Sequence, residues 1–267
     1  MCQMKELEGI VEMGICRMKE NALEYRYGEI KLVKLALVYV LAIACAIFLR
    51  VQSGVPAVFL SGIGFYILPM LWMFWELKKG DIPFRLWTAP IKKSACSDTF
   101  FAAILFIGIS MLVLLIEAML FQEGELTYEK SEWQRILVLA VLAPIVEECI
   151  CRGVILQSFL CKYSVKKAVW LSALLFYLIH FNVFNVLTIA AGVVFAVLMA
   201  KHCCLYLTIT VHFFWNLMLQ LKPWIIELLH TAGNQICLVL LLLSVLAIVS
   251  GLVKSLRLYR SVVNEAY

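Results

Sequence analysis

Runs of roughly 20 mostly apolar residues recur along the chain, and they restrict its possible folds more than any other feature. A lipid bilayer offers no water to backbone N–H and C=O groups, so a chain with such runs crosses it as helices. Hydrophobic residues make up 64% of the 267 residues and charged residues only 15%, which leaves too little polar surface for a water-soluble domain of this length. The sequence therefore predicts an all-α, polytopic membrane helical bundle.

About eight of these runs are candidate transmembrane helices. They cover residues 32–49, 55–75, 99–121, 136–160, 166–181, 183–200, 204–221 and 236–256. The fifth run is short and leads almost directly into the sixth, so a tilted or partly re-entrant hairpin is an alternative to two full crossings at that point. We expect an N-terminal arm over residues 1–30, a membrane domain over residues 31–258 and a tail over residues 259–267.

Lys and Arg occur in alternate connections: before the first run, between the second and third, between the fourth and fifth, between the sixth and seventh (Lys201), and after the last. Cytoplasmic loops of membrane proteins are rich in these residues, so both termini are predicted to lie in the cytosol, with the arm cytosolic or interfacial. We expect a multi-pass protein of a bacterial cell membrane that contacts membrane lipid. The sequence has no basic stripe interleaved with base-stacking aromatic residues, so nucleic acid is not an expected partner.

Three charged residues interrupt the fourth run: Glu147, Glu148 and Arg152, in PIVEECICRGVI. A charge at the centre of a membrane helix costs about 2.5–3.5 kcal/mol on insertion scales, so such residues face partners or a cavity and indicate a functional site. Glu148 and Arg152 are four residues apart and can pair on one helix face, whereas Glu147 points about 100° away from Glu148. Glu147 therefore has no ion-pair partner on its own helix, and such a carboxylate is suited to accept a proton from water.

Two further polar pairs with a four-residue spacing lie in the fifth and seventh runs. They are Phe176 and His180 in FYLIH, and His212 and Asn216 in HFFWN. Counting residues from the ends of the runs puts Glu147 and His212 at a similar depth. The same count puts His180 nearer the outer surface, unless the fifth run is tilted or displaced inward. One isolated carboxylate, two imidazoles and an amide are sufficient for water-dependent hydrolysis of a peptide bond.

Each of these features also has a structural explanation when it is taken alone. An ion pair such as Glu148–Arg152 can fix the position of a helix, and Phe176 can serve only in packing. Histidine and asparagine in membrane helices often form hydrogen bonds between helices. The functional interpretation depends on their joint occurrence on three helices.

These three motifs, in this order between Ala143 and Leu221, resemble the CAAX-protease and bacteriocin-processing (CPBP, Abi) family of intramembrane proteases. One departure is Cys151, at a position where the family often has an aromatic residue. The resemblance implies that Glu147 activates water with the help of His180, and that His212 and Asn216 stabilise the oxyanion. It also implies supporting roles for Glu148, Arg152 and Phe176.

The resemblance implies an intramembrane endopeptidase that hydrolyses a membrane-associated peptide or protein, entering from the cytosolic side or from the bilayer. CAAX-type processing, peptide maturation and bacteriocin self-immunity all fall within this description. The alternatives are a non-catalytic membrane binding or immunity protein that uses the same polar cavity, and a proton-coupled transporter. The transporter is disfavoured because the sequence shows no inverted repeat and no paired interrupted helices.

We expect that the reaction requires no cofactor. Zinc is the alternative, and Glu147, His180 and His212 are the residues that could hold it with one position open. The sequence lacks the HExxH spacing of many zinc proteases.

Overall fold

The structure is a computed structural model, and it describes residue 41 and residues 66–79, 90–121, 133–160, 162–180 and 186–263. Within these ranges the regular elements are all helices, which confirms the predicted all-α class. The predicted N-terminal arm, most of the first predicted run and residues 55–65 of the second lie outside the described residues.

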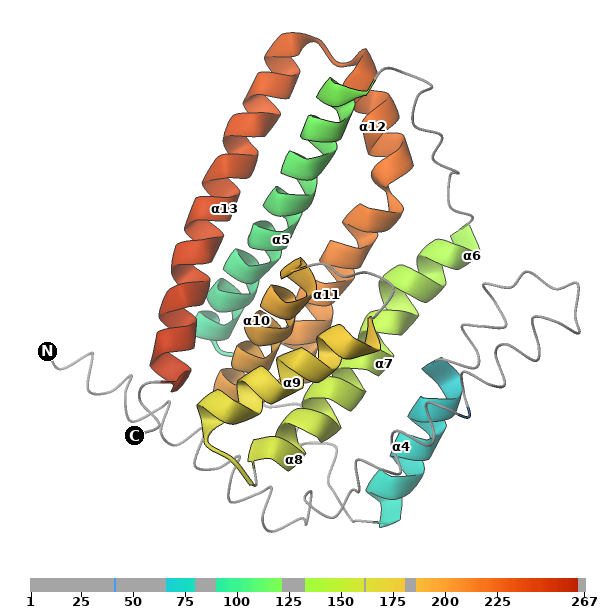
Figure 1. Cartoon of the computed structure of the whole chain (residues 1–267), viewed down its shortest axis with the longest axis vertical. Coiled ribbons are helices and arrows are strands. Elements are labelled where there is room, and N and C mark those ends of the chain that lie inside the picture. The colour runs from blue at the N-terminus through green and yellow to red at the C-terminus, as the bar shows by residue number, and fades with distance from the viewer. Residues whose placement is uncertain are drawn as a thin grey trace, which may run out of the picture.

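In chain order the elements are α4 (Leu68–Lys79), α5 (Lys93–Leu120), α6 (Trp133–Ile136), η4 (Leu137–Leu142), α7 (Ala143–Glu148), η5 (Cys149–Ile155), α8 (Leu156–Leu160), α9 (Val165–Ile179), α10 (Val186–His202), α11 (Leu205–Gln220), α12 (Lys222–Thr231) and α13 (Asn234–Val263) (Figure 1). Elements α6 to α8 follow one another without a break, and η4 and η5 are π-helical turns within this run. Helix α4 overlaps the end of the second predicted run, and the helices from α5 onward include the third to eighth predicted runs. The short helix α12 was not predicted, because the sequence indicated only a connection there.

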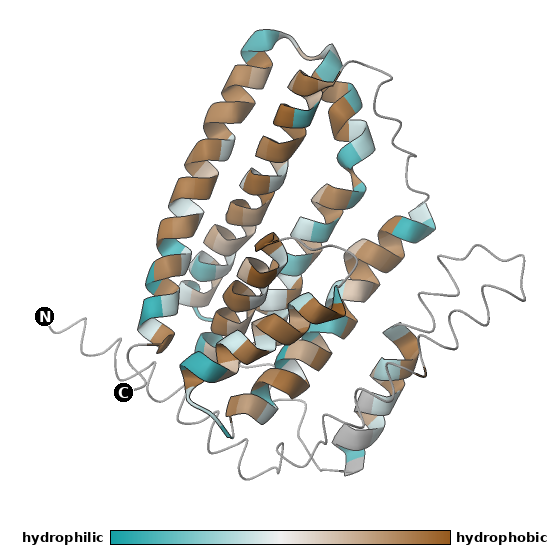
Figure 2. Ribbon diagram, in the orientation of Figure 1, coloured by the Kyte–Doolittle hydropathy of each residue, from teal (hydrophilic) through white to brown (hydrophobic). Residues whose placement is uncertain are grey.

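Within the described residues, α5 and α13 are the helices whose length and composition would allow them to cross a membrane (Figure 2). Helices α9 and α10 have 15 and 17 residues. At 1.5 Å per residue they are about 22 and 26 Å long, shorter than the roughly 30 Å hydrocarbon core. Helices α5 and α13 therefore support a membrane location. Because α9 and α10 are short, the crossing of the bilayer by about eight helices stays a prediction.

Helices α5 and α13 approach each other closely at Gly251. A Cβ atom on this residue would lie 2.6 Å from the carbonyl oxygen of Phe101 and 2.7 Å from Cβ of Leu105. Small residues at such positions let the backbones of membrane helices approach one another. In the most apolar stretch of α13 only 11% is buried, so most of its apolar side chains are available to lipid.

Helices α9 and α10 make a second close contact, at Gly192. A Cβ atom there would lie 2.9 Å from Cα of Ala173, so the absence of a side chain at Gly192 lets the two backbones approach. The approach also leaves the Gly192 carbonyl oxygen within reach of Arg152, at 3.2 Å from its Nη2 atom.

The buried carboxylate of Asp98 connects three helices, α5, α10 and α13. Asp98 on α5 lies 3.1 Å from Nζ of Lys201, 3.0 Å from Nε2 of His202 and 3.4 Å from Nζ of Lys254. The start of α5, the end of α10 and the C-terminal half of α13 therefore meet at one end, as the alternating basic connections predicted. Whether that end faces the cytosol stays a prediction.

Candidate active site

The helix that carries the glutamates is held by buried side chains at its π-helical turn η5. In this turn the N–H of Leu156 bonds the Cys151 carbonyl, five residues earlier. Two further buried donors reach carbonyls of the turn: Gln157 Nε2 bonds the Arg152 carbonyl at 3.2 Å, and Ser172 Oγ bonds the Cys151 carbonyl at 3.3 Å. These bonds fix a wide turn that an isolated helix would not favour, and π-helical turns are frequent at functional sites.

The predicted pair of Glu148 and Arg152 is present, and both side chains are completely buried. Arg152 Nη1 lies 3.0 Å from Glu148 Oε1. The guanidinium carbon also lies 4.3 Å from the ring centre of Phe176 and 5.2 Å from that of Phe195, so two aromatic rings each stabilise its charge by a cation–π contact. A buried ion pair needs such additional partners, because removing both charges from water costs several kcal/mol per ion.

His212 is the second partner of Glu148. Its Nδ1 atom lies 3.0 Å from Glu148 Oε1, and its ring stacks on Phe195 with centroids 5.2 Å apart. Because Glu148 is ionised in its pair with Arg152, its oxygen accepts, and Nδ1 of His212 carries the hydrogen. The other ring nitrogen, Nε2, faces Glu147 Oε2 at 3.7 Å.

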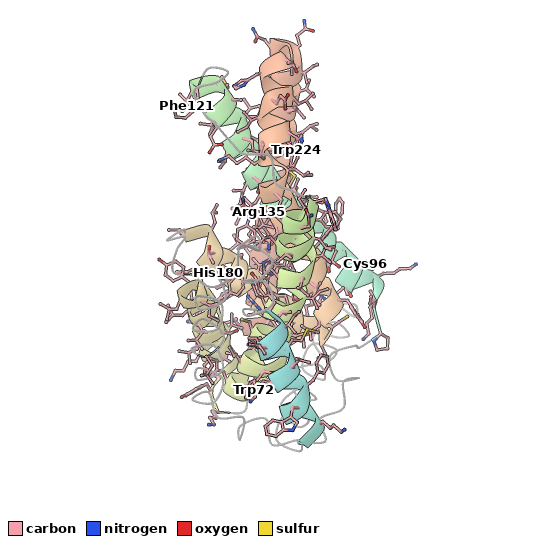
Figure 3. All side chains as sticks on the ribbon, turned by 90° about the vertical axis from the view of Figure 1, so that its right-hand side faces the viewer. Trp72, Cys96, Phe121, Arg135, His180 and Trp224 are labelled. Atoms are coloured by element: carbon pink, nitrogen blue, oxygen red, sulfur yellow. The ribbon has the colours of Figure 1, made fainter. Side chains whose placement is uncertain are left out.

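His180 is oriented in the same way by a different acceptor. Its Nδ1 atom lies 2.7 Å from the Phe176 carbonyl oxygen, which can only accept, so Nδ1 is the donor. Its Nε2 atom lies 3.3 Å from Glu147 Oε2. The depth count placed His180 nearer the outer surface unless its helix is tilted or displaced inward, and the structure has the tilted arrangement. Helix α9 ends at Ile179 and lies obliquely, which leaves His180 at mid-height of the bundle (Figures 1 and 3).

Glu147 is therefore the point on which two imidazoles converge, and its side chain is only 12% exposed. With neutral imidazoles, the two glutamates and Arg152 would leave the buried cluster with one net negative charge. A buried net charge is costly, so the cluster is stable when it holds one more proton. Since both Nδ1 atoms already carry hydrogen, that proton lies among Glu147 Oε2 and the two Nε2 atoms.

Asn216 lies one helical turn after His212 on α11, and the structure gives its amide a partner that the sequence did not indicate. Its Nδ2 atom donates to the Leu139 carbonyl oxygen at 2.8 Å. Asn216 is therefore close to the cluster of glutamates and histidines, and its amide is hydrogen-bonded to the helix that carries Glu147.

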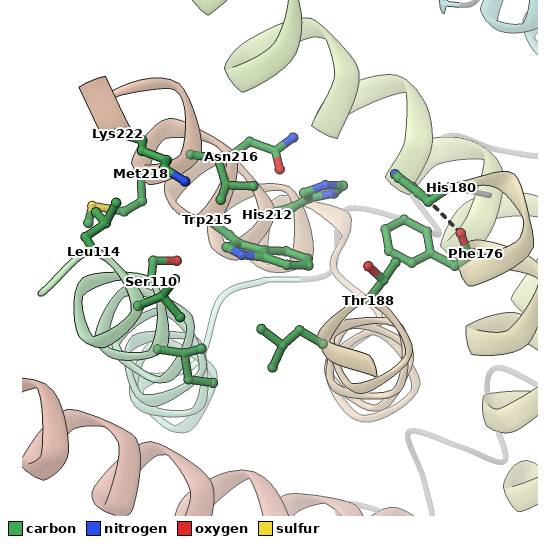
Figure 4. Close-up of a pocket in the computed structure, with 14 residues that line it drawn as sticks. Ser110, Leu114, Phe176, His180, Thr188, His212, Trp215, Asn216, Met218 and Lys222 are labelled. Atoms are coloured by element: carbon green, nitrogen blue, oxygen red, sulfur yellow. Dashed lines mark hydrogen bonds between the residues drawn. The ribbon is translucent and has the colours of Figure 1, made fainter. Parts of the chain in front are cut away.

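A cavity of about 240 Å³ lies beside this cluster (Figure 4). Its polar lining includes Ser110, His180, Thr188, His212, Asn216 and Lys222, and the rest is mostly apolar. The two histidines thus have one ring nitrogen near Glu147 while their side chains border a space that a small part of a peptide could occupy.

Sequence reasoning missed two aromatic members of the site. Tyr66, just before α4, lies beside the Glu147 side chain. Phe195 lies beneath both the His212 ring and the Arg152 guanidinium. Aromatic residues are common in membrane helices, so nothing in the sequence distinguishes these two from packing residues.

The structure leaves the question of a metal as it was. Among the described residues, no group of three or more His, Cys, Asp or Glu side chains has an arrangement that could hold a metal ion. Zinc binding by Glu147, His180 and His212 stays a hypothesis, which chelation experiments can test.

Comparison with known proteins gives one match. Residues 129–218 match the family model described as type II CAAX prenyl endopeptidase Rce1-like, and this segment contains the four predicted catalytic residues and their three predicted supporting residues. The match spans about a third of the chain. No curated protein and no solved structure matches.

Proposed function

We propose that the protein is an intramembrane endopeptidase in which Glu147 activates water to hydrolyse a membrane-associated peptide or protein. The match of residues 129–218 to the Rce1-like family model supports this proposal. The observation that supports this most directly is the position of Glu147 Oε2, at 3.3 Å from Nε2 of His180 and 3.7 Å from Nε2 of His212. A carboxylate beside two imidazoles that share a proton can accept a proton and return it within one reaction cycle.

In the proposed reaction a water bound to Glu147 gives its proton to the carboxylate while its oxygen bonds the peptide carbonyl carbon. The carbonyl oxygen becomes an oxyanion, and Nε2–H of a protonated His212 donates a hydrogen bond to it. His180 carries the proton from Glu147 to the leaving nitrogen as the C–N bond breaks. The products are a carboxyl group and an amine, and the cluster returns to its initial protonation state.

The supporting residues act by orienting the two imidazoles. Glu148 accepts from Nδ1 of His212 and the Phe176 carbonyl accepts from Nδ1 of His180, so each Nε2 is directed to Glu147. Arg152 keeps Glu148 ionised and therefore able to accept. Such second partners commonly fix the tautomer and orientation of a catalytic histidine.

The cavity lining bears on the substrate. Its mostly apolar wall suits a peptide segment with apolar side chains, and its few polar groups can bind the backbone. We propose that this segment enters from the cytosolic side or from the bilayer of a bacterial cell membrane, and that the multi-pass protein has both termini in the cytosol. CAAX-type processing, peptide maturation and bacteriocin self-immunity are processes that fit such a substrate, and the proposed reaction requires no metal.

The test uses purified protein in liposomes and a library of membrane-associated peptides, with the fragments identified by mass spectrometry. Wild type should cleave a subset of the peptides, while His180→Gln and His212→Gln should each lose most of this activity. His230→Gln is the matched control, because that histidine on α12 bonds the Phe121 carbonyl, away from Glu147. Cleavage by the first two variants at the wild-type rate would show that the proposed chemistry is wrong.

A further inference from the structure

We propose that Asn216 is a positioning residue: its amide replaces a backbone hydrogen bond that Pro144 cannot make, and thereby holds the helix that carries Glu147. The expected effect on cleavage rests on the proposed function. The claim that the Asn216 amide replaces the missing backbone hydrogen bond does not rest on that function. It can be tested without any substrate.

The Leu139 carbonyl lacks its helical donors. In an α-helix it would accept from residue 143, and in a π-helical turn from residue 144. The N–H of Ala143 bonds the Val138 carbonyl instead, in the π-helical pattern of η4. The next residue is Pro144, which has no N–H. Neither donor is therefore available to Leu139.

Asn216 supplies the missing donor from another helix. Its Nδ2 atom lies 2.8 Å from the Leu139 oxygen. An unsatisfied carbonyl within a membrane protein is costly, because no lipid group can hydrogen-bond it. The bond thus satisfies the Leu139 carbonyl and joins α11 to η4.

The position of the bond explains how it would affect Glu147. Asn216 is one turn from His212 on α11, and His212 holds Glu148 at 3.0 Å. Helix α11 is therefore hydrogen-bonded to the glutamate helix at two residues, Leu139 and Glu148, one on each side of Pro144. Two attachments fix the rotation of that helix about its axis, and this rotation determines whether Glu147 points toward the two Nε2 atoms.

The experiment compares Asn216→Ala, Pro144→Ala and the double variant with wild type. Alanine at position 144 restores a backbone N–H that can reach the Leu139 carbonyl. We expect Asn216→Ala to lower the unfolding midpoint by several degrees and to slow cleavage about ten-fold or more. The double variant should recover most of both losses. Asn216→Ala combined with Pro223→Ala, at the start of α12, is the matched control and should recover neither.

The two readouts separate the possible failures. If the double variant is no more stable than Asn216→Ala, the Asn216 amide does not replace a missing backbone hydrogen bond. This conclusion holds whatever the activity. If stability returns while cleavage stays as slow as in Asn216→Ala, then Asn216 contacts the reacting groups directly and the positioning role is wrong. If wild type cleaves nothing, the proposed function fails. The recovery of stability in the double variant still tests whether Asn216 replaces the missing backbone hydrogen bond. If Asn216→Ala alone does not fold, we expect the double variant to fold. A double variant that also fails to fold would contradict the proposal.

Discussion

The buried guanidinium of Arg152 gives the strongest quantitative prediction for stability. Replacing it with methionine keeps a long side chain but removes the hydrogen bonds to Glu148 and Gly192 and leaves Glu148 buried with His212 as its remaining partner. Breaking a buried ion pair by removal of one member costs about 3–5 kcal/mol. We therefore expect Arg152→Met to lower the free energy of unfolding by about this amount.

The assay is reversible unfolding in mixed detergent micelles, followed by circular dichroism. Arg135→Met is the matched control, because Arg135 lies on the same run of helix with an exposed side chain, and it should change the free energy by no more than about 0.5 kcal/mol. The double variant Glu148→Gln, Arg152→Met should lose less than the sum of the two single losses, since each removes the other's partner. A loss in Arg152→Met no larger than in the control would refute the burial of this pair.

Two further predictions concern the packing and the cofactor. Gly251→Ala should cost about 1–3 kcal/mol of stability in the same assay, because its Cβ would collide with the Phe101 carbonyl, whereas Gly233→Ala, with no atom within 4 Å of its added Cβ, should be nearly neutral. Cleavage by wild type should survive exhaustive chelation and dialysis, since Glu147 and the histidines carry the proposed reaction without a metal; activity lost on chelation and restored by zinc would contradict this.

The repeating apolar runs made the helical class readable from the sequence, and the spacing of Glu148 and Arg152 made their pairing readable as well. Both depend on local periodicity, which a sequence shows directly. The convergence of His180 and Glu147 depended on the tilt and length of α9. Those properties are set by packing such as the contact of Gly192 with Ala173, and the residue count along a straight helix could not supply them.

The carbonyl that Pro144 leaves without a donor could not be identified from the sequence. A proline in a regular helix leaves the carbonyl four residues earlier without a donor, which would be that of Ala140. The π-helical turn shifts the pattern by one residue, so the carbonyl that Asn216 reaches belongs to Leu139. The sequence shows Pro144 and Asn216 but gives no sign of this shift or of their relation.

The central claim is that the carboxylate of Glu147 accepts a proton from the attacking water. The most direct measurement is the single-turnover rate of peptide cleavage in liposomes for wild type and Glu147→Gln, which keeps the shape of the side chain but cannot take up the proton. General-base catalysis contributes about 10²–10⁴-fold, so the variant should be slower by that factor, while Glu227→Gln on the exposed side of α12 should match wild type. A Glu147→Gln rate equal to that of wild type would contradict the account.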